Sequence, residues 1–280
     1  MRRLLHLFSV FVMAGFTALA HAEIPAKVVL ITGSASGIGK ALAEQLLAAE
    51  HIVYGADIEV TGNGYLTELG GTPLVMDVTE DHQVRAGVDK IIREQGRIDV
   101  LVNNAGIGAI GPIEDLSDAQ VLEQFDVNVF GYGRLQRAVL PHMRAAGKGR
   151  IVVVSSLLGV ISVPALGWYS ASKHAVEAMA DTLAMEVKPQ GIDVVIIRPG
   201  ATATNFSDAS MVRYQQVEVS DVYKPMMQSY IDSRDSQRQR AQSPQEVAAV
   251  IVEAIAAVDP KPAYQTSEAV QRALDSDGRR

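Results

Sequence analysis

From residue 27 onward, short apolar runs alternate with longer amphipathic stretches. This alternation is typical of βαβ units, in which a helix follows each parallel strand and returns the chain to the same edge of the sheet. The runs are apolar at nearly every position, as expected for strands that are buried on both faces. The predicted strands cover residues 28–31, 52–56, 73–76, 100–102, 151–154 and 194–197.

Helical stretches separate these strands. The predicted helices cover residues 38–49, 81–95, 119–128 and 170–187. Capping boxes mark two helix starts, because Ser117 is followed by Gln120, and Ser243 by Glu246, at the spacing that pairs side chains and backbone N–H groups reciprocally. These signals indicate helix starts independently of the apolar periodicity.

The C-terminal part of the chain is less regular. Polar residues 234–242 are predicted to form a solvated loop, and a shortened seventh strand is expected near residues 262–266. With 280 residues, of which 48% are hydrophobic, the chain has apolar mass for one sizeable core. The sequence therefore predicts a single α/β domain over residues 23–280, built on a doubly wound parallel sheet, the Rossmann fold.

The first 22 residues differ from the rest. Two arginines precede an apolar run over residues 4–20, and a small-x-small pattern ends at residue 22. We expect residues 1–22 to be a signal peptide or, because the run is near the shortest length that spans a bilayer, a membrane anchor. The chain would then be exported or membrane-tethered. A cytoplasmic location is the alternative if the start codon is misassigned, and Met13 is available as another start.

Charge and cysteine content narrow the function. The formal net charge is −7, and acids or glutamines interrupt the arginine-rich stretches, so the chain has no basic field for phosphate backbones. We therefore expect no nucleic-acid partner. Without cysteine there is no disulfide, thiolate metal site or thiol nucleophile, and either a reducing or an oxidising compartment fits.

A glycine-rich turn, Thr-Gly-Ser-Ala-Ser-Gly-Ile-Gly, follows the first predicted strand directly and opens a helix. Its backbone N–H groups and the positive helix end can approach a pyrophosphate, because no side chain stands in the way. This strand–turn–helix context predicts a dinucleotide site rather than a plain tight turn. The residues assigned to the cofactor here are Gly33, Ser36, Gly37, Ile38 and Gly39.

An acidic residue ends the second predicted strand. Asp57 stands eighteen residues beyond Gly39, where a carboxylate accepts two hydrogen bonds from the adenosine ribose and repels a 2′-phosphate. Its neighbourhood agrees, since Ser36 and Ile58 are uncharged and offer no cation for a 2′-phosphate. We therefore expect NAD to be preferred over NADP. The alternative is that Asp57 only caps a turn.

A tyrosine and a lysine point to acid/base chemistry. Tyr169 and Lys173 are four residues apart in a helical run, so both project from one face. The ammonium is expected to stabilise the phenolate and lower the tyrosine pKa from about 10 toward the working range of a general base. Ser156 closes the fifth predicted strand, at the edge where α/β sheets place their chemistry, and can hold a substrate oxygen.

The histidines do not suggest catalysis or metal binding. His174 follows Lys173 directly and therefore faces away from it, so we expect a structural or solvated role. The other histidines are scattered without metal-ligand spacing, and Ser156 has no histidine and acid that would make it a hydrolase nucleophile. No metal is expected.

Together these motifs resemble the short-chain dehydrogenase/reductase family. The resemblance rests on the glycine turn, Asn-Asn-Ala-Gly at residues 103–106, Asn128, the serine, tyrosine and lysine, and Pro-Gly at residues 199–200, in the family's order and spacing. It runs from about residue 27 to residue 204 and departs from the family's pattern only at the chain ends. The resemblance implies an NAD-dependent enzyme of the compact branch, similar to hydroxysteroid and retinol dehydrogenases.

The resemblance also implies roles for individual residues. Asn104, Ala105 and Gly106 would support the strand beside the adenine ribose, and Asp77 and Val78 would contact the adenine. Further along the chain, Asn128 would bind a water that links Lys173 to solvent, Lys173 would also bind the nicotinamide ribose, and Thr204 would bind the nicotinamide carboxamide. The set of implied cofactor contacts also includes Tyr169, Pro199 and Gly200.

The implied reaction interconverts a secondary alcohol and a ketone. Tyr169 would take the proton of an alcohol held by Ser156 while hydride passes to the nicotinamide, and reduction would run in reverse. Residues 205–242 should cover the substrate, and within them a methionine- and tyrosine-rich helical stripe is either a packed face or a pliable lid. This stripe comprises Val222, Tyr223, Met226, Met227, Tyr230 and Ile231.

An apolar pocket is expected near the motifs. It would be lined by Ile107, Ile110, Leu157, Leu158, Val163 and Trp168, which favours a bulky hydrophobic alcohol or ketone as substrate. Two alternative functions are a sugar-nucleotide epimerase or dehydratase, which shares the tyrosine–lysine pair, and a non-catalytic nucleotide-sensing protein on the same fold. The resemblance further implies a homodimer or homotetramer formed through helices that include residues 119–143 and 170–187.

Overall fold

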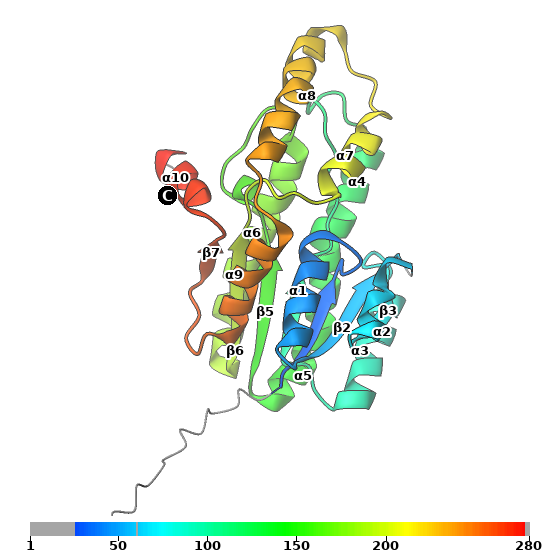
Figure 1. Cartoon of the computed structure of the whole chain (residues 1–280), viewed down its shortest axis with the longest axis vertical. Helices are drawn as coiled ribbons and strands as arrows, with labels where there is room; N and C mark the ends of the chain where they lie inside the picture. The colour runs from blue at the N-terminus through cyan, green and yellow to red at the C-terminus, as the bar shows by residue number, and fades with distance from the viewer. Residues whose placement is uncertain (1–25, 60, 278–280) are drawn as a thin grey trace, which may run out of the picture.

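The computed structural model describes residues 26–59 and 61–277 and shows one parallel sheet of seven strands between two layers of helices (Figure 1). The strand order is β3-β2-β1-β4-β5-β6-β7. The strands are β1 (Val28–Thr32), β2 (Ile52–Asp57), β3 (Thr72–Val75), β4 (Val100–Asn103), β5 (Gly149–Val154), β6 (Ile192–Arg198) and β7 (Ala263–Gln265). The predicted doubly wound α/β fold is confirmed.

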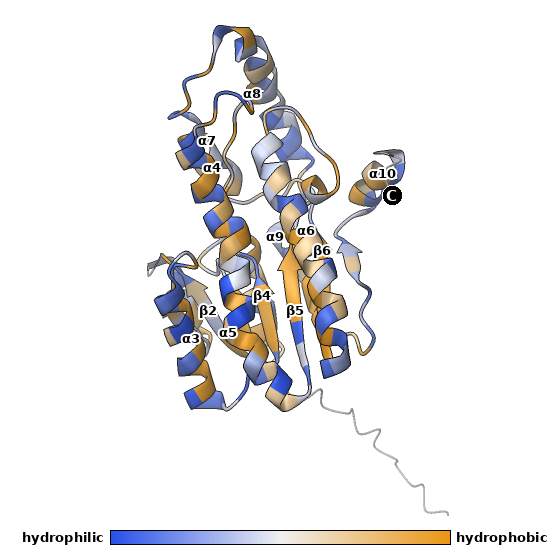
Figure 2. Cartoon of the chain, turned by 180° about the vertical axis from the view of Figure 1, so that it is seen from behind, coloured by the Kyte–Doolittle hydropathy of each residue, from blue (hydrophilic) through white to orange (hydrophobic). Residues whose placement is uncertain are grey.

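Helices cover both faces of the sheet. One face carries α1 (Gly37–Ala48) and α9 (Pro244–Ala256), and the other carries α3 (Asp81–Gln95), α5 (Gly131–Ala146) and α6 (Gly167–Val187). Successive side chains of β1 alternate between the two cores, because Val28 and Leu30 pack on one side and Val29 and Ile31 on the other. The strands are therefore apolar on both faces, and β4 and β5 stand out as apolar in Figure 2.

The order in which successive strands join the sheet reverses between β1 and β4. The chain winds outward from β1 through β2 to β3 and then crosses back to β4, which pairs with β1 from Val29 and Val100 onward. At such a switch point the loops that follow the two strands diverge and leave a crevice at the carboxyl edge, the usual ligand site of open α/β sheets. Three further helices, α4 (Asp118–Phe125), α7 (Phe206–Tyr214) and α8 (Lys224–Gln239), lie beyond this edge in Figure 1.

The predicted helix over residues 119–128 ends differently in the structure. The α-helix α4 stops at Phe125, and a π-helical segment, η2 (Asp126–Phe130), leads directly into α5. A π-helical turn adds a residue to the i→i+4 pattern and rotates its side chains, and here it carries Asn128 into the protein interior with no exposed surface. Both predicted capping boxes, at Ser117 and Ser243, are confirmed.

The prediction of a loop over residues 234–242 is wrong, because α8 continues through Gln239. The polar sequence stays helical because its side chains find partners one turn away, as Gln237 does with Ser233, and because Arg234 bonds to Asp208 of α7. The expected short seventh strand is present as β7, and it is followed by α10 (Glu268–Asp277).

The predicted leader, residues 1–22 with its apolar run over residues 4–20, lies outside the described residues. Across residues 26–59 and 61–277, no helix is both long and apolar enough to cross a membrane.

Arg150 joins the first residues of β5 to the end of α9. Its guanidinium donates hydrogen bonds to the carbonyl oxygens of Ala254 and Ala257, each at 2.7 Å, and to the carboxylate of Asp193 at 2.8 Å. Carbonyls at a helix end have no partner within the helix, so this side chain satisfies groups that the fold buries.

We expect Arg150→Met to lower the free energy of unfolding by about 3 kcal/mol, because it leaves buried carbonyls at the end of α9 without a donor and removes the less exposed of the two cations at Asp193. Lys188→Met is the matched control: it removes the other cation at Asp193, but that lysine side chain is 69% exposed, so its loss should cost under about 1 kcal/mol. Urea unfolding measures both. Equal effects would show that burial does not determine the contribution of Arg150.

Candidate active site

The glycine turn after β1 is held tightly against the loop after β4. Gly33 and Gly37 have positive φ angles of 68° and 54°, which favour glycine. The Asn104 side-chain amide donates to the Thr32 carbonyl at 2.9 Å and to the Gly33 carbonyl at 3.2 Å. A Cβ atom on Gly39 would lie 2.1 Å from the Gly33 oxygen, so only glycine fits there. The turn therefore presents bare backbone at the N-terminus of α1, which fits a pyrophosphate.

Thr32 connects the same two loops, and sequence reasoning missed it. Its hydroxyl accepts hydrogen bonds from the backbone N–H groups of Asn104 and Ala105, both at 3.1 Å, and donates to the Val102 carbonyl at 3.3 Å. These bonds place residues 104 and 105 against the end of β1. The only signal in the sequence is the position of Thr32, the last residue of an otherwise apolar strand.

Asp57 caps two turns, which was the alternative to a ribose contact in the sequence analysis. One carboxylate oxygen accepts from the Ala35 N–H of the glycine turn at 2.9 Å, and the other accepts from the Glu59 N–H at 3.0 Å. A carboxylate has about four acceptor sites, so these bonds leave capacity for a ribose. Asp57 is partly exposed, and Ile58 beside it is 67% exposed. The ribose contact stays a prediction.

The residues expected at the adenine lie after β3. Asp77 accepts hydrogen bonds from the Thr79 backbone and hydroxyl at 2.8 and 2.7 Å, which closes a tight turn. Val78 is buried, and its carbonyl accepts from Arg134 of α5 at 3.3 Å, while Arg134 also pairs with Asp126 at 2.6 Å. Arg134 thus holds the loop after β3 against the start of α5. No motif in the sequence indicated this role of Arg134.

Ser156, Tyr169 and Lys173 gather at the carboxyl end of β5. Ser156 accepts the Leu158 N–H at 3.1 Å, and its side chain is hydrogen-bonded to the phenol of Tyr169. The Lys173 ammonium nitrogen, Nζ, lies 5.9 Å from the centre of the Tyr169 ring and donates to the Val154 carbonyl at 2.9 Å. The predicted arrangement of these three groups is present at one end of the sheet, next to the dinucleotide crevice.

The expected acidic tyrosine is not present in this arrangement. Burial raises the pKa of Tyr169 to about 12, and the hydrogen bond with Ser156 acts in the opposite direction. Burial also lowers the pKa of Lys173 to about 8, against the attraction of Glu177. The prediction of a lowered Tyr169 pKa is wrong here because desolvation of the phenolate by burial raises the pKa by more than the hydrogen bond with Ser156 lowers it. At neutral pH the phenol keeps its proton and the amine is mostly charged.

Asn128 clamps the loop that follows β4. Its amide oxygen accepts the Ile107 N–H at 2.8 Å, and its amide nitrogen donates to the Ile107 carbonyl at 2.9 Å and to Ser172 Oγ at 3.2 Å. Both N–H groups of the amide are therefore used, so the side chain can donate no further hydrogen bond to a water. The water-relay role implied by the resemblance stays a prediction.

Thr204 lies beside the glycine turn, as its expected role requires. Its methyl group is 3.1 Å from the position that a Cβ atom on Gly37 would take. The loop after β6 therefore lies against the glycine turn after β1. The Pro199 carbonyl accepts the Leu157 N–H at 2.8 Å, which ties this loop to the end of β5. Gly200 contacts α10, since a Cβ atom there would be 2.9 Å from Val270.

The region expected to cover the substrate begins with an aromatic contact on Tyr169. The ring of Phe206, the first residue of α7, lies 5.5 Å from the Tyr169 ring at 56°. The predicted stripe on the next helix packs on a small satellite cluster rather than on the main core: Met227 is buried against Ile110, whereas Val222 is 76% exposed.

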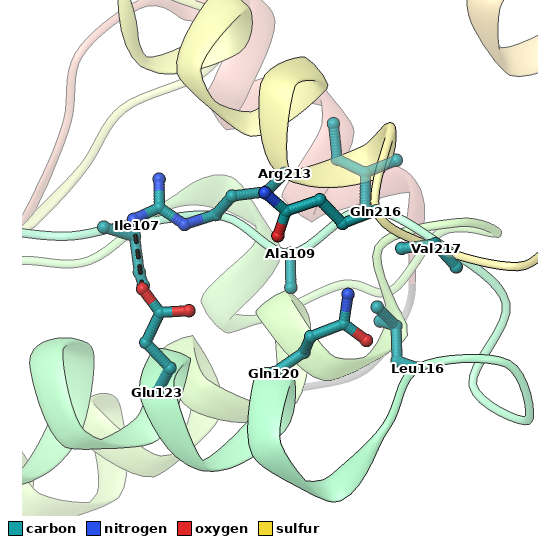
Figure 3. A pocket seen from close by; sticks show the side chains of 9 residues that line it. Ile107, Ala109, Leu116, Gln120, Glu123, Arg213, Gln216 and Val217 are labelled. Atoms are coloured by element: carbon teal, nitrogen blue, oxygen red, sulfur yellow. Dashed lines mark hydrogen bonds and ion pairs between the residues drawn. The ribbon is translucent and has the colours of Figure 1, made fainter.

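A small cavity lies between α4, α7 and the loop after β4 (Figure 3). Arg213 of α7 and Glu123 of α4 face each other across it at 3.2 Å. Its volume of about 20 Å³ has room for one water molecule. Of the six residues expected to line an apolar pocket, Ile107 and Ile110 line this cavity and the other four do not.

His174 bonds to the Ser170 carbonyl of its own helix at 2.8 Å, which agrees with a structural role.

Comparison with known proteins identifies the family. The profile described as short chain dehydrogenase matches residues 27–214. The chain therefore belongs to the short-chain dehydrogenase/reductase family, as the motifs indicated. A structure of a short-chain dehydrogenase/reductase from Burkholderia phymatum in complex with NAD superposes with a TM-score of 0.80 at 27% identity, covering 90% of this chain and 93% of that one.

Two curated relatives are similar over much of the chain. A 3-ketodihydrosphingosine reductase of Bacteroides thetaiotaomicron is 44% identical over 182 residues, which is 65% of this chain and 66%, just under two thirds, of the relative. Human 17-beta-hydroxysteroid dehydrogenase type 1 is 35% identical over 256 residues, covering 86% of this chain and 77% of the relative.

We expect Gly39→Ala to weaken NADH binding at least about tenfold, because its methyl group would overlap the Gly33 oxygen and open the phosphate cradle. Gly133→Ala is the matched control, since the nearest atom to a Cβ there is 3.5 Å away. NADH fluorescence on titration gives both affinities, and circular dichroism checks folding. A folded Gly39→Ala protein with unchanged affinity would contradict this assignment.

Proposed function

We propose that this enzyme is an NAD-dependent oxidoreductase that interconverts a secondary alcohol and a ketone. The observation that carries the proposal is the convergence of Ser156, Tyr169 and Lys173 at the carboxyl end of β5, beside the glycine turn. A hydroxyl donor, a phenol and an ammonium there can polarise an oxygen and move one proton to or from it.

Each group has a distinct part in the reaction. A bound nicotinamide supplies or accepts the hydride at the reacting carbon. In reduction, Ser156 donates a hydrogen bond to the ketone oxygen and Tyr169 transfers its proton to that oxygen as the alcohol forms. Oxidation reverses these transfers, with Tyr169 accepting the proton. Because the pKa of Tyr169 is raised to about 12, the phenol holds at neutral pH the proton that reduction consumes.

A bulky hydrophobic substrate is the second part of the proposal. Phe206 places an apolar ring against Tyr169, and Ile107 and Ile110 are apolar side chains of the loop that follows β4. The two curated relatives carry names that refer to a ketodihydrosphingosine and a hydroxysteroid, both large and mostly apolar. The small cavity between α4 and α7 is not lined by Ser156, Tyr169 or Lys173, so it is not the proposed substrate site.

Assembly and location are also proposals. We propose a homodimer or homotetramer formed through α4, α5 and α6, which is supported by Leu122, Phe130 and Met185, all more than half exposed on or between these helices. Export or membrane tethering through residues 4–20 rests on the sequence alone.

We expect Tyr169→Phe to reduce turnover at least about 100-fold while leaving NAD affinity unchanged, because only the proton-transferring hydroxyl is lost. Tyr54→Phe, which removes a phenol hydroxyl of β2 bonded to Glu94 outside the proposed site, is the control and should keep full turnover. A panel of secondary alcohols with NAD, followed by the absorbance of the reduced cofactor, measures both. Undiminished turnover of Tyr169→Phe would contradict the mechanism.

We expect Asp57→Ala to relax discrimination against NADP by about tenfold or more, since the carboxylate no longer repels a 2′-phosphate. Asp57→Asn is compared with it because the amide keeps an oxygen acceptor for the Ala35 or Glu59 N–H and loses only the charge. The ratio of dissociation constants for NADPH and NADH is the readout. An unchanged ratio in both variants would show that the carboxylate does not reach the ribose.

A further inference from the structure

A second buried tyrosine shares a hydrogen-bond acceptor with the active-site lysine. Tyr132 of α5 is 1% exposed and lies four residues after Asn128. Its hydroxyl donates to the Val154 carbonyl at 3.1 Å, and Lys173 Nζ donates to the same oxygen at 2.9 Å. One carbonyl at the end of β5 therefore fixes both side chains.

The ring of Tyr132 also faces the ammonium. Lys173 Nζ lies 5.5 Å from the centre of the Tyr132 ring and 5.9 Å from the centre of the Tyr169 ring. Both distances are within the range of cation–π attraction, which is strongest when the cation is desolvated. Lys173 is 4% exposed, so water cannot take over this role.

We propose that Tyr132 is a positioning residue for Lys173: its hydroxyl, anchored on the Val154 carbonyl, holds the ring face against the ammonium and keeps that charge beside Tyr169. The inference rests on the proposed function for its consequence in catalysis. Its geometry does not depend on the substrate or the direction of the reaction.

The charged groups near Lys173 have other partners, so neutral groups position its ammonium. Glu177 lies one helical turn away, but its carboxylate is bonded by the Arg198 guanidinium at 2.8 and 3.1 Å. Tyr169 keeps its proton because burial raises its pKa to about 12. Burial lowers the pKa of Lys173 to about 8, and Glu177 acts in the opposite direction. The neutral groups in contact with the ammonium are the Val154 carbonyl and the rings of Tyr132 and Tyr169.

The test is a direct titration of Lys173 in the full-length protein. Lysine labelled with ¹³C at Cε reports the eight lysines by NMR, and the Lys173 signal is assigned as the one absent from Lys173→Arg. Three variants at position 132 are compared: Tyr132→Phe keeps the ring, Tyr132→Leu removes it, and 3,4,5-trifluorophenylalanine keeps the shape of phenylalanine but withdraws charge from the ring face.

We expect the Lys173 pKa to fall by about one unit in Tyr132→Leu, and the trifluoro variant to titrate at least about 0.3 unit below Tyr132→Phe. The trifluoro comparison decides the question even if the leucine variant does not fold. Equal pKa values for Lys173 in the phenylalanine and trifluoro variants would overturn the proposal and leave Tyr132 as core packing.

The titration needs no turnover, so it separates this inference from the proposed function. Where turnover is measurable, the alkaline limb of the kcat/KM profile should move to lower pH in the same order of variants, because the ammonium is lost earlier. A uniform fall in kcat with an unmoved limb would count against Tyr132 acting through Lys173.

Discussion

The hydrogen bond between the Lys173 ammonium and the Val154 carbonyl is the contact on which the site depends. An ammonium removed from water needs compensating partners, and this one receives them at the end of β5, a central strand paired on both sides by β4 and β6. A carbonyl in that position cannot move without disturbing the sheet. The lysine is therefore held by the most rigid part of the fold, and Tyr169, one helical turn before it, is placed by the same anchor.

The parallel sheet explains why distant motifs meet. Each crossover returns the chain to the same edge, so the glycine turn after β1, the loop after β4, the serine after β5 and the loop after β6 all open toward one crevice. Direct contacts confirm this convergence: Asn104 bonds to the Gly33 carbonyl, and Thr204 touches Gly37. A dinucleotide laid across the switch point would meet backbone at one end and the catalytic side chains at the other.

Sequence reasoning predicted the sheet, its seven strands and the position of Ser156, Tyr169 and Lys173 at its carboxyl edge, because buried strands and glycine turns are encoded locally. It failed where the outcome depends on contacts made after folding. The π-helical segment before α5 and the continuation of α8 through Gln239 depend on tertiary and side-chain partners, and the roles of Thr32, Arg134 and Tyr132 follow from neighbours far away in the sequence. The Tyr169 pKa was misjudged because spacing reveals the nearby charge but not the loss of solvent.

The central claim is that the Tyr169 phenol keeps its proton because it is buried, although the Lys173 ammonium lies 5.9 Å from its ring centre. NMR titration of protein labelled with ¹³C at tyrosine Cζ, with the Tyr169 signal identified by its loss in a Tyr169 variant, tests it most directly. The account predicts that Tyr169 stays protonated through pH 10 and ionises near pH 12. A Tyr169 signal that titrates below pH 10 would contradict it and would show that Lys173 controls the phenol.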